Sequence, residues 1–72
     1  MTRKRERGTP LSPREKEVLK HLYAGLSVRA IAEKLGIASS TVGQHKKSLF
    51  QKLGVHSERA AVAVGLKDGI IR

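Results

Sequence analysis

The sequence has no cysteine and no tryptophan, and it has one phenylalanine and one tyrosine. The absence of cysteine excludes disulfide bonds and thiolate metal sites, and the three histidines are too widely spaced to form a metal cluster. Scarce aromatic residues argue against a cofactor pocket and against a stacking platform for single-stranded nucleic acid. No uncharged run is long enough to span a bilayer, and no secretory signal is expected. We therefore expect no metal, no cofactor, no small-molecule ligand and no membrane contact.

Basic residues, in contrast, are abundant in this short chain. The 72 residues include 15 lysines and arginines against 6 aspartates and glutamates, which gives a formal net charge of +9. Residues 1–10 and residues 39–56 each hold three more basic than acidic residues, and the second segment has no acid at all. A small and strongly basic chain of this kind is typical of proteins that bind nucleic acid.

The chain is long enough for one domain only. Its first segment, MTRKRERG, has no apolar residue after Met1, so residues 1–10 are predicted to form a disordered basic tail. We expect this tail to add non-specific affinity for DNA. Residues 11–72 are predicted to form the folded domain.

Serine and glycine punctuate the rest of the chain. Serines precede, and glycines follow, four segments with helical periodicity, which is the pattern expected at the two ends of a helix. No segment alternates polar and apolar residues with a period of two. The sequence therefore predicts an all-α fold. The predicted helices are 13–24, 28–35, 40–53 and 58–67, with the N-cap serines Ser12, Ser27, Ser39 and Ser57.

The first three predicted helices each have an apolar stripe that can contribute to one core. After Gly69, the two residues Ile70 and Ile71 are expected to fold back onto that core. The predicted core residues on the stripes are Val18, Leu19, Leu22, Ile31, Ala32, Leu35, Val42, Leu49 and Leu53.

Few residues separate the second helix from the third. A connection of three or four residues that contains Gly36 holds two helices at a steep crossing angle, as in a helix-turn-helix motif. An ordinary corner between helices has the same short connection. The charge favours the motif, because the third helix carries bases and no acids.

The third helix has a polar side opposite its apolar stripe. Hydroxyl, amide and ammonium groups on that side can bond base edges and phosphates in the major groove of DNA. Gly43, at its margin, indicates either close approach of the backbone to DNA or a tolerated weak position. Lys46 falls nearer the core side and is expected to extend its ammonium to a phosphate, while His45 fits either a half-buried site or a phosphate contact. The outward residues are Ser40, Gln44, Lys47, Ser48 and Gln51.

The order and spacing of these residues resemble the LuxR-type, or GerE-type, helix-turn-helix family. The resemblance runs from Leu11 to about Ile71, and its fragments are specific only in combination. It implies a four-helix DNA-binding domain that dimerises through its last helix and regulates transcription. The fragments are Leu11-Ser12-Pro13-Arg14-Glu15, Glu17-Val18-Leu19, Gly25-Leu26-Ser27, Ile31-Ala32-Glu33-Lys34-Leu35, Ser39, Thr41-Val42, His45, Lys52-Leu53-Gly54-Val55 and Ser57.

Helical spacing and the resemblance together identify the candidate DNA contacts. In the family, position 43 is commonly lysine, so Gly43 leaves more of the discrimination to Gln44 and Lys47. Position 46 is often aliphatic, whereas Lys46 resembles the subset with a basic residue there. The predicted base-facing residues are Ser40, Gly43, Gln44 and Lys47. The predicted backbone contacts are Ser39, Thr41, His45, Lys46, Ser48, Gln51 and Lys52.

The last predicted helix, residues 58–67, is apolar on more than one side. This surplus either completes the core of the protomer or forms the dimer interface that the resemblance implies. The expected partners are double-stranded DNA, a second copy of the chain and RNA polymerase, and the expected location is the cytoplasm, at the nucleoid. The predicted interface residues are Ala61, Val62, Gly65 and Leu66.

Two other functions fit a small basic helical domain. A sigma-factor region 4 module has similar first three helices, but the fourth helix and the ending Lys52-Leu53-Gly54-Val55 argue against it. A small adaptor for an acidic partner in the transcription machinery would bind at high salt and would not shift DNA. An enzyme is not expected, because no nucleophile has a base at a recognisable spacing. Whether the chain is a stand-alone regulator or part of a longer one is left open by the sequence.

Overall fold

The computed structural model describes residues 10–71, and this part of the chain folds into four helices without strands. The helices are α2 (Pro13–Tyr23), α3 (Val28–Leu35), α4 (Ser39–Leu53) and α5 (Glu58–Lys67). The predicted all-α fold is confirmed, and each helix begins and ends within one residue of its predicted bounds. None of the four reaches the length and hydropathy that a bilayer-crossing helix needs. The predicted tail lies outside the described residues, except for its last residue, Pro10.

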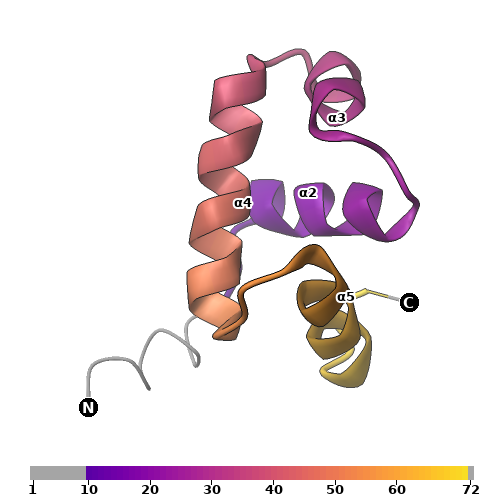
Figure 1. Ribbon diagram of the computed structural model, residues 1–72, viewed down its shortest axis with the longest axis vertical. Coiled ribbons are helices and arrows are strands. Elements are labelled where there is room, and N and C mark those ends of the chain that lie inside the picture. The colour runs from indigo at the N-terminus through magenta and orange to yellow at the C-terminus, as the bar shows by residue number, and fades with distance from the viewer. Residues whose placement is uncertain (1–9, 72) are drawn as a thin grey trace.

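The helix α4 forms one long side of the molecule, and α2 lies across it at a steep angle (Figure 1). On the two sides of α2 lie α3, next to the beginning of α4, and α5, next to its end. Both α2 and α3 pack against α4, while α5 packs mainly against α2. The helix α4 is therefore supported along one side.

Three of the predicted serine caps are confirmed. The Ser12 hydroxyl accepts a hydrogen bond from the Glu15 backbone N–H at 3.1 Å, and the Glu15 carboxylate accepts one from the Ser12 N–H at 2.8 Å. This reciprocal capping box begins α2, with Pro13 in the first turn. Ser27 and Ser57 cap α3 and α5 more simply, since each hydroxyl accepts one backbone N–H at 3.1 Å.

The turn between α3 and α4 differs from the prediction by one residue. Gly36 ends α3 in the left-handed region, with φ of 69°, and the Ile37 N–H donates back to the Ala32 carbonyl at 3.0 Å. Ala38 is then already the N-cap of α4, with an extended backbone and no side-chain cap. The prediction that Ser39 caps α4 is therefore wrong. Because Gly36 turns the chain immediately after α3, only Ile37 and Ala38 lie between this glycine and the next helix. Ser39 is therefore the first residue of α4.

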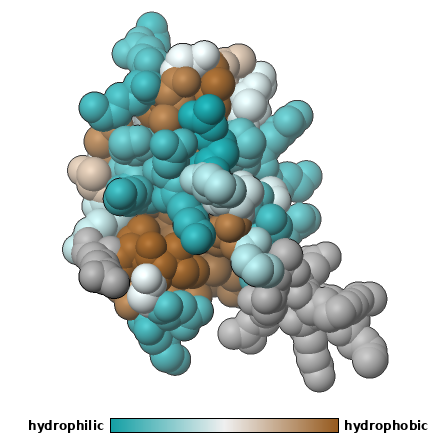
Figure 2. Space-filling view, turned by 180° about the vertical axis from the view of Figure 1, so that it is seen from behind, coloured by the Kyte–Doolittle hydropathy of each residue, from teal (hydrophilic) through white to brown (hydrophobic). Residues whose placement is uncertain are grey.

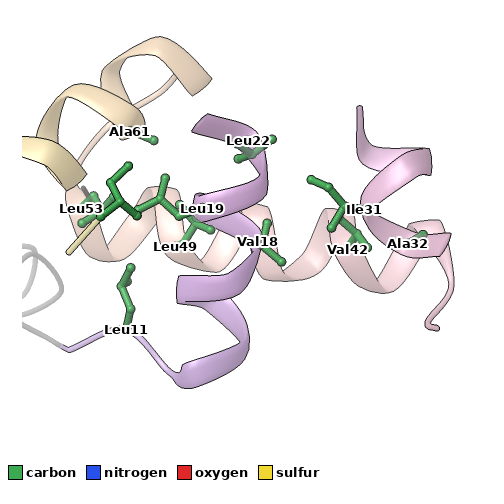
Figure 3. Close-up of a cluster of buried hydrophobic side chains, with 11 residues drawn as sticks. Leu11, Val18, Leu19, Leu22, Ile31, Ala32, Val42, Leu49, Leu53 and Ala61 are labelled. Carbon is green, nitrogen blue, oxygen red and sulfur yellow. The ribbon is translucent and has the colours of Figure 1, made fainter. Parts of the chain in front are cut away.

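The core lies where α2 crosses the other helices, and it confirms the predicted stripes of α2 and α4. Figure 3 shows one group of side chains toward α5 and a second group toward α3. Ile71 is 3% exposed, so the predicted return of the chain onto the core is also confirmed. The first group includes Leu11, Leu19, Leu49, Leu53 and Ala61, and the second includes Ile31, Ala32 and Val42.

Candidate nucleic-acid interface

One side of α4 is open to solvent along its whole length. Val42, Leu49 and Leu53 are buried against the other helices, as predicted. Except for Ser48, which is half-buried, the residues predicted on the opposite side of the helix are exposed, and they carry hydroxyl, amide and ammonium groups without a carboxylate. All four residues predicted to face bases belong to this exposed side. They are Ser40, Gly43, Gln44 and Lys47.

Gly43 interrupts this row of side chains. A Cβ atom added at Gly43 would meet nothing within 4 Å, so the protomer has ample room for a side chain there. Glycine in a helix interior costs about 1 kcal/mol relative to alanine. No close contact within residues 10–71 accounts for the glycine. The result is a bare stretch of backbone beside Gln44 and Lys47.

The residues predicted to contact the DNA backbone divide into two groups by exposure. Ser39 and Gln51 are exposed near the two ends of α4. The others are half-buried along the flanks of the helix. These half-buried residues are Thr41, His45, Lys46, Ser48 and Lys52.

Two residues of the half-buried group bond to a carboxylate of α2. The Lys52 ammonium donates to Glu15 Oε1 at 2.8 Å, and the Ser48 hydroxyl donates to Glu15 Oε2 at 2.7 Å. Since Ser48 and Lys52 are one turn apart on α4, a single carboxylate fixes the rotation of this helix against α2. The structure thus gives both side chains a partner inside the protomer.

Glu15 is the one charged residue buried in the described part of the chain, with 5% exposure. Burial by itself raises the pKa of a carboxyl group, because it disfavours the charged form. Hydrogen bonds from Lys52, the Ser12 N–H and Ser48 stabilise that form and outweigh the effect of burial. Together they lower the pKa of Glu15 from 4.5 to about 2. The carboxylate is therefore ionised at neutral pH and holds α4 in place.

Lys46 takes part in a second cross-helix pair. Its ammonium donates to Glu58 Oε2 at 2.6 Å, at the beginning of α5. The same Nζ atom lies 5.9 Å from the centroid of the Phe50 ring. The ammonium of Lys46, which the sequence prediction assigned to a phosphate, is thus bound to a carboxylate that the prediction did not include.

These two pairs change the electrostatics of α4. Among the ion pairs within residues 10–71, Lys46 and Lys52 each take part in one, and Lys47 takes part in none. The segment without acids is therefore partly neutralised by Glu15 and Glu58, which belong to other helices. Sequence spacing could not reveal them, because Glu15 lies 37 residues from Lys52 along the chain.

The predicted dimer face of α5 is corrected by the structure. Ala61 is 0% exposed and Gly65 is also buried, so both belong to the core of the protomer and are not open to a partner. A Cβ atom at Gly65 would lie 2.9 Å from Leu19 Cδ2, which shows how closely α5 packs on α2. Val62 is half-buried and Leu66 is 42% exposed. Figure 2 shows a hydrophobic area low on the molecule, where Figure 1 places α5.

Comparison with known proteins finds similarity to bacterial regulatory proteins. The family described as bacterial regulatory proteins, luxR family, matches residues 9–64, which is more than half of the chain. The transcriptional regulatory protein MctR of Rhizobium johnstonii is 41% identical over 66 residues, covering 92% of this chain and 31% of that protein. The probable transcriptional regulatory protein NarL of Mycobacterium tuberculosis is 41% identical over 71 residues, covering 93% of this chain and 33% of that protein.

The fold has a similar counterpart among solved structures. It is similar to part of the response regulator ChrA in a heme-sensing two-component system, with a TM-score of 0.84 and 40% identity. The similarity covers 88% of this chain and 31% of that one. The chain thus spans about a third of the length of MctR and NarL.

Proposed function

The chain belongs to the luxR family of bacterial regulatory proteins, and we propose that it binds double-stranded DNA with sequence specificity, as a homodimer, and so regulates transcription. Its four helices have the helix-turn-helix fold of the DNA-binding regulators of this family. The observation that carries the proposal is the exposed side of α4, which is polar, free of carboxylates and held out from the protomer by α2 and α3.

In the proposed complex, α4 lies in the major groove. That groove is ~12 Å wide and admits an α-helix with its side chains. The Gln44 amide suits adenine, to which it can form two hydrogen bonds, and the Lys47 ammonium suits O6 and N7 of guanine. Ser40 can donate to or accept from either kind of base. The bare backbone at Gly43 would let α4 approach the base edges between these side chains.

Contacts with phosphates are assigned to the ends and flanks of α4. At its beginning, the positive end of the helix dipole favours a phosphate near Ser39 and Thr41. His45 and Gln51 can donate from the flank and from the far end. We leave Ser48 and Lys52 out of this set because both are bonded to Glu15.

Dimerisation is proposed through the part of α5 that remains exposed. Leu66 is one of two exposed large hydrophobic residues among residues 10–71, and half-buried Val62 lies one turn before it. A symmetric dimer would place two copies of α4 in successive major grooves, about 34 Å apart, over a palindromic site. RNA polymerase remains a candidate second partner at the promoter. Since bacterial DNA is the proposed ligand, the proposal also places the chain in the cytoplasm, at the nucleoid.

Selection of bound duplexes from a random pool tests the proposal. The bound sequences should share a motif with two inverted half-sites, and sedimentation on a selected duplex should show two chains per duplex. A motif without symmetry and one chain per duplex would overturn the dimer. A pool without any enriched sequence would overturn specific binding.

The Lys47→Ala variant tests the assignment of a residue to a base. If Lys47 reads a base, the variant should bind the selected duplex more weakly by about 1–3 kcal/mol and should tolerate other bases at one position. The matched control is Lys20→Ala, which removes the same charge from an exposed position on α2. Equal losses on selected and random duplexes would assign Lys47 to the phosphates instead.

A further inference from the structure

The ion pair between Lys46 and Glu58 joins the proposed DNA-binding helix to the next helix. Lys46 Nζ lies 2.6 Å from Glu58 Oε2 at the surface. The side chain of Lys46 is 26% exposed and that of Glu58 is 53% exposed. Both groups are therefore in contact with solvent as well as with each other. A pair of this kind can open without uncovering the core.

A phosphate of a bound duplex is a second anion that the Lys46 ammonium can reach. It directly precedes Lys47, which lies on the exposed side of α4, so the two are one step apart around the helix. A lysine side chain has a flexible four-carbon stem and three N–H donors, and it can turn its ammonium from one anion to another. A phosphate bound along this flank of α4 would compete with the Glu58 carboxylate for the same ammonium.

We propose that Glu58 limits the affinity of this chain for DNA by occupying Lys46, and that binding exchanges the carboxylate for a phosphate. This inference rests on the proposed function, since it assumes that α4 meets a duplex. Glu58 lowers the affinity in two ways. It neutralises one of the three lysines of α4, and it adds a negative charge beside the phosphates.

The position of Glu58 explains why a carboxylate stands there. It is the first residue of α5, where a negative charge favours the positive end of the helix dipole. The hydroxyl of Ser57 provides the cap of this helix independently, through its bond to the Ala60 N–H. A Glu58→Gln variant therefore keeps the cap and loses only the charge. We expect it to remain folded.

The test compares Glu58→Gln with the unaltered chain on a duplex of random sequence, so no knowledge of the operator is needed. Because exposed ion pairs are weak, the affinity should rise roughly three- to fivefold for each subunit at low salt. The slope of log K against log salt should become steeper by about 0.9 per subunit, as one more phosphate is neutralised. The matched control is Asp68→Asn, which removes the same charge from the other end of α5, about 15 Å away.

A second variant shows whether the effect passes through Lys46. Lys46→Gln should weaken binding. In the double variant the Glu58 substitution should raise the affinity by less than it does in the unaltered chain, because only the repulsion between the carboxylate and the phosphates is then removed. Three results would overturn the inference: an unchanged affinity and slope in Glu58→Gln, an equal gain in Asp68→Asn, or a full gain in the absence of Lys46. If the unaltered chain bound no duplex at all, the proposed function would fail, and this outcome is distinct from the other three.

Discussion

Glu15 should make the stability of this domain depend strongly on acidity. The carboxyl group has a pKa of about 2 in the folded protein, against 4.5 for an ordinary glutamate. At 1.36 kcal/mol for each pH unit, this difference corresponds to about 3 kcal/mol of folding free energy. Because the pKa is lowered on folding, this contribution is present above about pH 4.5 and is lost as the pH falls toward about 2.

The perturbation that isolates this contribution is Glu15→Gln, which keeps the size of the side chain and removes its charge. The free energy of unfolding should be measured by urea denaturation at a series of pH values, with helix content as the signal. Near neutral pH the variant should be less stable by about 2–3 kcal/mol. The two curves should converge toward about pH 2, where Glu15 itself becomes protonated.

The control for Glu15 is an exposed carboxylate on the same helix, that of Glu17. Glu17 has a side chain that is 52% exposed and pairs with Arg14 at 3.3 Å. Glu17→Gln should change the stability by less than about 1 kcal/mol, because exposed pairs contribute little. A difference between Glu15→Gln and the unaltered protein that stays constant from about pH 6 to about pH 2 would refute the reasoning.

Two glycines should respond to alanine in opposite directions. Gly65→Ala should destabilise the domain by about 1–2 kcal/mol, measured by thermal or urea unfolding. The reason is that the Cβ atom of the alanine would lie 2.9 Å from Leu19 Cδ2 in a filled core. An increase in stability would contradict that packing. Gly43→Ala should instead raise stability by about 1 kcal/mol, since its Cβ meets nothing within 4 Å. The same variant should bind a selected duplex less tightly, and unchanged affinity would show that α4 does not approach DNA closely at Gly43.

Much of the fold is predictable from local patterns in the sequence. The apolar spacing of Val18 with Leu22, and of Val42 with Leu49, identifies the buried sides of α2 and α4 correctly. Serine caps at three helices follow from the chemistry of the hydroxyl group. The error at Ser39 arises because the length of the preceding turn, rather than the nearest hydroxyl, decides where α4 begins.

What the sequence does not predict are contacts between residues that are distant along the chain. Glu15 stands three residues after the predicted N-cap Ser12, but its bonds to Ser48 and Lys52 depend on how α2 crosses α4. The surplus of apolar residues in α5 likewise leaves two interpretations open. Packing against α2 assigns Ala61 to the core, while Leu66 remains exposed.

The most direct test of the account is to map the surface that meets DNA, residue by residue, with backbone amide NMR during titration with a selected duplex. The largest shifts should fall on the exposed side of α4, at Ser40, Gly43, Gln44 and Lys47, with smaller shifts in the core. Shifts confined to α2 and α5, with the amides of α4 unchanged at saturation, would contradict the central claim.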